Sequence, residues 1–438
     1  MNPVIETVLQ VVKKGKRKLI GYRRDFHKYP ESGWCEFRTA SKIADVLHGL
    51  GYNVMVGEEV METSTMMGVP EAQELELEQQ RAVRQGANFE WVQKMSGGKT
   101  GVMATMKFYQ PGPTIAFRFD IDANDVAEAE SEDHLPWREG FASVNKGIMH
   151  ACGHDGHAAI GLMLAEVITQ FKDQLIGCIK IIFQPAEEGV RGAKAMAAAG
   201  VVNDVDYFFG MHLGLGLKQT GMITCKTEGF LATTKLDAIF KGTPAHAGAA
   251  PEAGRNALLA AATAALNIHA IARHSEGASR VNVGVLHAGS GRNVVPANAI
   301  LKLETRGETA EINGYIYHEV IRILYSAAQM HQVTVELTEV GSAIGCNNDP
   351  ELAARLNQLA RKSNLFGTVL SSANLGGSED CAYFMERVQQ CGGKAAYLMI
   401  GSDLAAGHHD SYFDFDESIL ATATAFLSTI AVDFLIKH

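Results

Sequence analysis

The sequence predicts an α/β protein with a mostly parallel mixed sheet, helices on both of its faces, and a smaller inserted α+β domain. From about residue 99, short apolar segments alternate with helical patterns, as in proteins built from βαβ units. Between residues 228 and 340 the expected strands alternate apolar with polar residues, and the earlier pattern returns after 340. We therefore expect one large domain in two parts, 1–227 and 341–438, with an inserted domain at 228–340.

Composition limits the class of protein. The chain has 438 residues, 47% of them hydrophobic, enough for two or three domains with cores of their own. A formal charge of −10 argues against nucleic acid or anionic membranes as partners. Seven cysteines without CxxC pairs are typical of a reducing compartment, and neither a secretion signal nor a run of about 18 apolar residues is present. We expect a cytoplasmic protein.

The first part of the large domain begins with helices. Apolar residues recur at three- and four-residue steps between 7 and 50, and the basic stretch 13–28 is interpreted as a solvated helix face. Residues 58–98 contain eight acidic and three basic residues, and their composition favours helix. Because their apolar periodicity is weak, we expect this acidic segment to be a helical insertion on the surface.

The remaining elements follow from their periodicity. In the large domain we expect strands at 102–106, 114–119, 178–183, 206–211 and 395–400, and helices at 157–171, 191–199, 351–362 and 417–436. In the inserted domain we expect strands at 235–241, 280–287, 300–306 and 333–340, and helices at 256–273 and 312–331. The order strand, helix, strand, strand, helix, strand is that of a ferredoxin-like split βαβ unit.

The densest chemical signal is the segment 150–157, which reads HACGHDGH and contains Cys152 and His154 just before an expected helix. A structural zinc finger would need a second pair of ligands at matching spacing, and the other cysteines are isolated. A catalytic metal instead takes ligands from several loops, ideally at the carboxyl ends of parallel strands. The segment therefore favours a catalytic metal site.

Three further loops offer suitable ligands. Glu187 and Glu188 follow the strand at 178–183, His212 follows 206–211, and His408-His409 come after 395–400. Thiolate, imidazole and carboxylate together suit zinc or manganese, and one shared ligand can bridge two ions. The two adjacent glutamates can divide the work, one as ligand and one as general base for a metal-bound water.

Two aspartates end the strand at 114–119. Asp122 could bind metal directly or could accept a hydrogen bond from a ligand histidine, and we favour the second role because metal-bound histidines nearly always have such a partner. Asp120 is interpreted as structural, and for His27 we favour a structural role over support of the site.

Seven motifs lie in order along the chain: RFDID (118–122), HACGHD (150–155), QPAEEG (184–189), GTPAHAG (242–248), NVVP (293–296), GSED (377–380) and HDSYF (409–413). Together with His212 they resemble the amidohydrolase branch of the dinuclear-metal aminoacylase and carboxypeptidase family, which includes hippurate hydrolase and the auxin-conjugate amidohydrolases. The resemblance covers nearly the whole chain. It implies a zinc-exopeptidase-like catalytic domain in which metal ions activate water for amide hydrolysis.

The resemblance also implies individual roles. Two divalent ions, Mn²⁺ or Zn²⁺, would be held by Cys152, His154, Glu188, His212 and His409, and Glu187 would be the general base. The ligand histidine in relatives lies four residues before a phenylalanine, which selects His409 over His408, although a slip of one residue stays open. Members outside this branch have aspartate at the position of Cys152 and histidine at that of Asp120.

In relatives the inserted domain is a lid and a dimerisation surface. The resemblance implies that His246 polarises the scissile carbonyl, commonly in the partner subunit's site, and that Asn293 and Arg306 bind the substrate's carboxylate. From the residues alone, His246 could equally be a loop histidine and Arg306 part of an ion pair on the strand face.

The segment 58–98, with AGAAPE (247–252) and SEGASRVNVG (275–284), resembles one subgroup of the branch more closely. That subgroup cleaves p-aminobenzoyl-glutamate and pairs an A-type chain with a homologous B-type chain. We therefore expect hydrolysis of the amide between an acyl or aroyl group and an amino acid, by a homodimer or by a heteromer with a B-type chain. The alternatives are a general N-acyl-amino-acid amidohydrolase or dipeptidase, and a weakly active or non-catalytic subunit.

Overall fold

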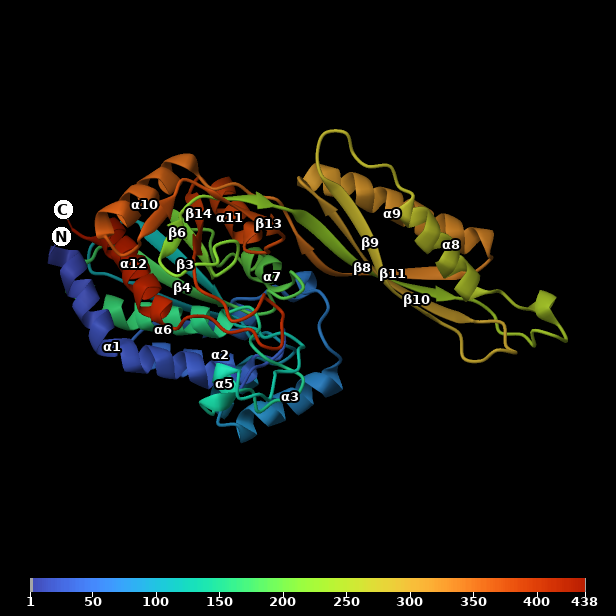
Figure 1. Ribbon diagram of the computed structural model, residues 1–438, viewed down its shortest axis with the longest axis horizontal. Helices are drawn as coiled ribbons and strands as arrows, with labels where there is room; N and C mark the ends of the chain where they lie inside the picture. The colour runs from blue at the N-terminus through green and yellow to red at the C-terminus, as the bar shows by residue number, and fades with distance from the viewer. Residues whose placement is uncertain (1–2, 438) are drawn as a thin grey trace.

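A mixed eight-stranded sheet forms the centre of the larger lobe in the computed structural model, which describes residues 3–437 (Figure 1). Across the sheet the strands are β1 (Asn53–Val56), β2 (Val102–Lys107), β4 (Cys178–Gln184), β3 (Thr114–Asp120), β5 (Tyr207–Leu213), β14 (Lys394–Ile400), β6 (Met222–Thr224) and β12 (Thr368–Leu370). The four central strands β4, β3, β5 and β14 are parallel. Their carboxyl ends therefore meet at one edge, as expected of an α/β sheet.

Helices cover both faces of this sheet. One layer contains α1 (Pro3–Lys28), α2 (Phe37–Gly49), α6 (His154–Thr169), α10 (Pro350–Ser363) and α12 (Ser418–Leu435), and the other contains α7 (Gly192–Ala198) and α11 (Ala382–Gln390). Alternate strand residues feed separate cores, because successive side chains of a strand point to opposite faces. Phe117 and Phe119 of β3 lie in the core under α6, whereas Ala116 lies in the core under α7 and α11.

Helix α12 is long and apolar enough to span a membrane by length and composition. Its apolar residues are accounted for without one, because 78% of that stretch is buried inside the protein. It packs against α1 and α6, so we assign it to the core of the larger lobe.

The acidic segment is helical, with α3 (Ala72–Arg84) and α4 (Phe89–Lys94) packed on α2. Leu75 and Val92 anchor it in the main core. The interpretation of the basic stretch 13–28 as a solvated face is wrong at Arg23, which is fully buried. Its guanidinium lies 2.8 Å from Asp155 and 2.6 Å from Asp414, so it ties α1 to the loop-bearing side of the sheet.

The smaller lobe consists of β8 (Ala232–Lys241), α8 (Ala257–His269), β9 (Ser279–Ala288), β10 (Asn298–Gly307), α9 (Ala310–Met330) and β11 (Thr334–Ala343). Its four strands are antiparallel in the order β11-β8-β10-β9, the arrangement of a split βαβ unit. Leu236, Ala238 and Phe240 of β8 pack under α8 and α9. The opposite face of this sheet carries no helix and is turned toward the larger lobe (Figure 1).

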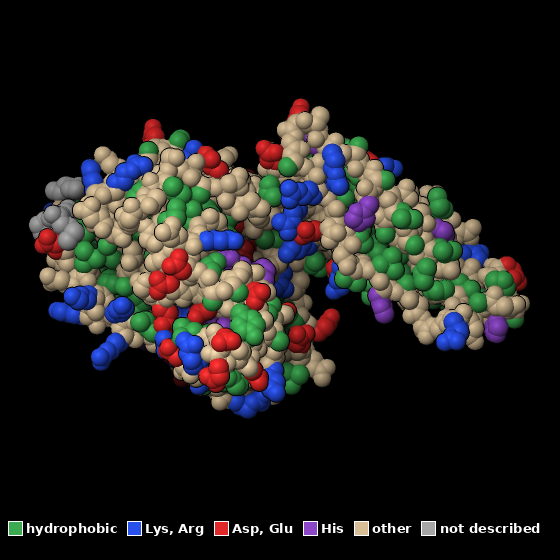
Figure 2. All heavy atoms as spheres, in the orientation of Figure 1, with side chains coloured by type: hydrophobic (Ala, Val, Ile, Leu, Met, Phe, Trp, Pro, Cys, Tyr) green, Lys and Arg blue, Asp and Glu red, His purple; other side chains and the backbone are tan. Residues whose placement is uncertain are grey.

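Short elements complete the chain: α5 (Leu135–Arg138) and the parallel pair β7 (Thr227–Phe230) and β13 (Ala373–Gly377). Figure 2 shows the two lobes separated by a hollow, with lysine and arginine side chains on the smaller lobe facing histidines on the larger one.

Candidate metal centre

His154 is oriented by the strand beside it. Gly153, with φ of 89°, turns the chain into α6 in a conformation that favours glycine, so that His154 lies in the first helical turn. The ring Nδ1 lies 3.0 Å from the backbone oxygen of Asp122 and 3.3 Å from its Oδ1, at the end of β3. The other ring nitrogen, Nε2, is buried and has no protein hydrogen-bond partner. A carboxylate behind one nitrogen and a free lone pair on the other is the usual arrangement of a metal-bound histidine.

Cys152 and His212 lie on the other side of this free nitrogen. Cys152 Sγ is 3.5 Å from His212 Nε2, and both atoms lie within 4.8 Å of a ring nitrogen of His154. His212 donates Nδ1–H to the Leu213 carbonyl over 2.8 Å, which leaves its Nε2 as an acceptor. Burial raises the pKa of the Cys152 thiol and lowers the pKa of His212. A cation at this point would stabilise the thiolate that burial alone disfavours.

The glutamate pair lies on a tight turn after β4. Ala186 and Val190 flank the pair with φ values of 49° and 59°, a backbone conformation that is costly without glycine and is often retained at functional sites. Two carboxylates hold the turn: Glu36 Oε1 accepts the Ala186 N–H over 2.7 Å, and Asp122 Oδ2 accepts the Glu188 N–H over 2.8 Å.

His409 completes the ring of ligands around Glu188. Its Nε2 lies 3.2 Å from Glu188 Oε1, and both residues group with Cys152. His409 has a φ of 65°, and its backbone N–H donates to the Ala151 carbonyl over 2.8 Å, which places it beside the HACGHD loop. His408 also lines the cavity, with a buried unpartnered Nε2, so the slip of one residue stays open on geometry alone.

His157 is satisfied without a metal. Its Nε2 accepts the Leu213 N–H over 3.0 Å and its Nδ1 lies 2.5 Å from Asp120 Oδ1. Asp120 is also 2.6 Å from buried Arg118, which supports the structural interpretation of that aspartate. His27 lies behind the site, within 2.8 Å of Asp155 and of Glu128.

Glu187 is the carboxylate best suited to proton transfer. Burial, followed by the charges of Glu379 and Glu188, raises the pKa of Glu187 well above its usual range. Its Oε2 is 4.0 Å from His154 Nε2, close to the ligand cluster. A buried carboxylate held near its protonated form can take up a proton and release it again near neutral pH.

The remaining site candidates divide into two groups. Arg306 lines the same cavity of about 270 Å³ as Cys152, Glu187, Glu188, His212 and His409. Its guanidinium is paired with Glu304 at 2.9 Å, so the ion pair weighed from the sequence is present inside the cavity.

His246 and Asn293 are not brought to this cavity within the chain. They lie side by side in exposed loops, joined by a bridge between His246 and Val294 and by the Ala247 N–H donating to the Asn293 carbonyl over 3.0 Å. Figure 1 shows the β8–α8 loop at the end of the smaller lobe farthest from the large sheet.

Lys235, which sequence reasoning missed, also lines the cavity. The available signal was the alternation of β8: Thr233, Lys235 and Asp237 occupy the face that the two helices do not cover.

The donor set suits a divalent metal: one thiolate, imidazoles with free nitrogens, and carboxylates around a buried point. A model of the peptidase family M20/M25/M40 matches residues 116–432. The chain belongs to this family. Members of the M20 family hydrolyse amide bonds with divalent metals, and this chain is a metallo-hydrolase of that kind.

Two relatives match the M20 chain over nearly their full lengths. It is 51% identical to the A-type chain of p-aminobenzoyl-glutamate hydrolase of Escherichia coli, covering 98% of this chain and 99% of that one. It is 52% identical to indole-3-acetyl-aspartic acid hydrolase of Enterobacter agglomerans, covering 94% and 95%.

Two solved structures share the fold. The aminobenzoyl-glutamate utilization protein of Klebsiella pneumoniae matches with a TM-score of 0.83 and 43% identity, covering 97% of both chains. A dinuclear metal-binding M20 peptidase of Bacillus subtilis matches with a TM-score of 0.66 and 25% identity, covering 96% of this chain and 98% of that one.

Proposed function

We propose that this protein hydrolyses the amide bond between an acyl or aroyl group and an amino acid, with p-aminobenzoyl-glutamate as the best candidate substrate. The main support for the proposal is Glu187, a buried carboxylate beside a ligand cluster and on the wall of a cavity. The names of the two relatives, at 51% and 52% identity, give the substrate class: each describes an amide conjugate of an amino acid with an acidic side chain.

Cys152, His154, Glu188, His212 and His409 are the proposed ligands of two divalent ions, Mn²⁺ or Zn²⁺. The short distance between Glu188 and His409 favours His409 over His408. When bound, such ions lower the pKa of water and polarise a carbonyl oxygen. Asp122 has a supporting role, since it orients His154 and fixes the backbone of Glu188.

The residues of the chain then divide the proton transfers. Glu187 takes a proton from the attacking water and gives it to the leaving nitrogen, so that the amine departs neutral. His246 of a second subunit donates a hydrogen bond to the carbonyl oxygen as negative charge develops there, a contribution of roughly 3–4 kcal/mol. Arg306, with Asn293 from the second subunit, binds the carboxylate of the substrate.

A second subunit is part of this proposal because His246 and Asn293 lie at the far end of the smaller lobe. We assign residues 228–340 to a lid and dimerisation domain between the two parts of the catalytic domain. The assembly is a homodimer through this domain or a heteromer with a homologous B-type chain, since the E. coli relative is named as one subunit of its hydrolase. All seven cysteines are free in residues 3–437, and we place the protein in the reducing cytoplasm.

A substrate panel tests the proposal. Purified chain, alone and with a B-type partner, is assayed with p-aminobenzoyl-glutamate, hippurate and dipeptides in the presence of Mn²⁺ or Zn²⁺. We expect the aroyl-glutamate to have the highest kcat/KM. Equal turnover of all three classes supports a general N-acyl-amino-acid amidohydrolase or dipeptidase, and activity only with the partner supports an incomplete subunit.

A further inference from the structure

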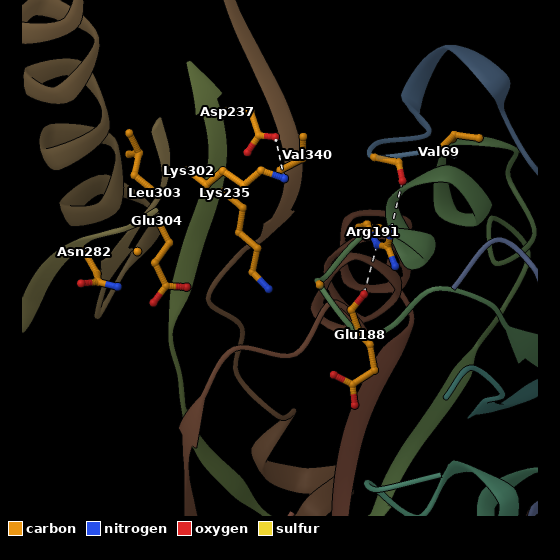
Figure 3. A pocket seen from close by; sticks show the side chains of 13 residues that line it. Val69, Glu188, Arg191, Lys235, Asp237, Asn282, Lys302, Leu303, Glu304 and Val340 are labelled. Carbon is orange, nitrogen blue, oxygen red and sulfur yellow. Dashed lines mark hydrogen bonds and ion pairs between the residues drawn. The ribbon is translucent and has the colours of Figure 1, made fainter. Parts of the chain in front are cut away.

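The face of the smaller sheet that lacks helices carries a regular set of charged side chains. Cross-strand pairing places Lys235 of β8 opposite Glu304 of β10, and Asp237 opposite Lys302. Arg306 lies two residues from Glu304 on the same strand, so Lys235 and Arg306 are diagonal neighbours on one face. This face and the loop at residues 188–191 form the walls of a cleft of about 610 Å³ between the lobes (Figure 3).

Most of the cations in this cleft already have partners. Lys302 is 3.6 Å from Asp237, and Arg306 is 2.9 Å from Glu304. The Arg191 guanidinium donates to two backbone carbonyls, that of Glu188 over 3.1 Å and that of Gly68 over 3.0 Å.

Lys235 differs from these three. Among residues 3–437, no hydrogen bond or ion pair is made by its ammonium group, which points into the cleft in Figure 3. Burial lowers the pKa of Lys235, because the ammonium has lost hydration without gaining a contact from the protein. A half-buried cation of this kind is completed by an anionic ligand.

The position of Lys235 identifies which part of a ligand it would meet. Lys235, Glu188 and Gly189 line both the wide cleft and the smaller cavity that contains the metal-ligand candidates. Lys235 therefore lies at the passage between them, one diagonal step from Arg306. An amino acid whose α-carboxylate is bound by Arg306 would extend its side chain along this face.

We propose that Lys235 binds the side-chain carboxylate of the amino acid and thereby selects conjugates of dicarboxylic amino acids. This inference rests on the proposed amide hydrolysis and adds a specificity determinant to it. Arg306 and Lys235 form a two-point site, one cation for each carboxylate. Glu304, which lies between them in the register, compensates one of the two positive charges, so an amino acid with a neutral side chain leaves Lys235 without an anion.

A matched pair of substrates tests this role: p-aminobenzoyl-glutamate and p-aminobenzoyl-glutamine, which differ only in the charge of the side-chain terminus. Removing a hydrogen bond to a charged group costs about 10- to 100-fold in affinity. We expect Lys235→Met to raise KM for the glutamate compound by about that factor with little change in kcat, and to leave both constants for the glutamine compound within about 3-fold. Inhibition by free L-glutamate should weaken by the same factor as KM rises.

The control is Lys241→Met, on the same strand but exposed and paired with Glu336 at 2.7 Å. It should change neither substrate preference nor inhibition. Activity on the glutamine compound, or unaltered circular dichroism and metal content, shows that the Lys235 variant is folded.

Two results would overturn the role of Lys235 while leaving amide hydrolysis intact. One is a wild-type enzyme that does not prefer the glutamate compound, or a variant that keeps that preference and its inhibition by L-glutamate. The other is an equal loss of kcat on both substrates, which would place Lys235 in the chemical step. Absence of turnover by wild-type protein on every amide tested is a different result, because it contradicts the proposed function itself.

Discussion

The backbone N–H of Glu188 donates to Oδ2 of Asp122 over 2.8 Å. The same aspartate faces Nδ1 of His154 with its backbone oxygen and its Oδ1. One buried side chain at the end of β3 thus orients a candidate ligand from the β4 turn and another from the start of α6.

Replacement of Asp122 tests this coupling. Asp122→Ala removes the side-chain acceptors of both contacts, so we expect divalent-metal affinity to fall about 10- to 100-fold. Asp125→Ala is the control, because Asp125 is exposed and bonds only Ser32 among the described residues. Metal titration by calorimetry measures both; equal affinities for the two variants would remove Asp122 from the site.

Metal removal should destabilise the fold as well as stop turnover. The carboxylates of Glu187 and Glu188 and the thiol of Cys152 converge on one buried point, which a cation stabilises only in the folded state. At a free metal concentration about 100-fold above Kd, the free energy of unfolding should rise by about 3 kcal/mol. Thermal melts with chelator and with restored Mn²⁺ or Zn²⁺ measure this; identical melting curves would contradict a metal bound at this cluster.

The His27 ion-pair network predicts a pH dependence of stability. Burial and Arg23 lower the pKa of His27, but hydrogen bonds and charge attraction from Asp155 and Glu128 outweigh them and raise it to about 9. Because this lies above the unfolded value near 6.5, the stabilisation is fully present below about pH 6.5 and is lost as pH rises through 9. The loss is on the order of 3 kcal/mol.

Urea unfolding at pH 6, 7.5 and 9 tests the His27 prediction. His27→Gln should be less stable than wild type at pH 6 and should approach it at pH 9. His48→Gln is the control, since His48 lies on the exposed side of α2. Parallel pH profiles for wild type and His27→Gln would show that this histidine is neutral in the folded protein.

Separation of His246 from the cavity predicts complementation between subunits. In a homodimer, mixing inactive His246→Ala with inactive Glu187→Gln creates one intact site in each mixed dimer, so activity should return to about a quarter of wild type after subunit exchange. The double variant mixed with either single variant is the control and should stay inactive. Without recovery in dimers shown by mass spectrometry to be mixed, His246 does not act across the interface.

Much of the site could be predicted because its residues follow strands in sequence. Glu187 and Glu188, His212 and His409 each come at or after the end of a parallel central strand, and such ends meet at one edge. The alternation of β8 and β10 likewise supports the strand pairing of the smaller lobe.

Other features depend on tertiary contacts that no local pattern encodes. Arg23 lies in a basic stretch of α1, yet it is buried by acidic partners more than a hundred residues away. Lys235 matches an ordinary polar strand position until the facing lobe turns its side of the sheet into the wall of a cleft. The remoteness of His246 also depends on how the two lobes are arranged.

The Glu187→Gln variant provides the sharpest test of the proposed mechanism. The change removes the base but keeps the shape of the side chain and all five proposed ligands. Bound metal measured by mass spectrometry and turnover of p-aminobenzoyl-glutamate are compared with those of wild type. We predict unchanged metal content with kcat reduced at least about 100-fold; turnover near the wild-type rate with metal bound would contradict the assignment of Glu187 as the proton-transfer residue.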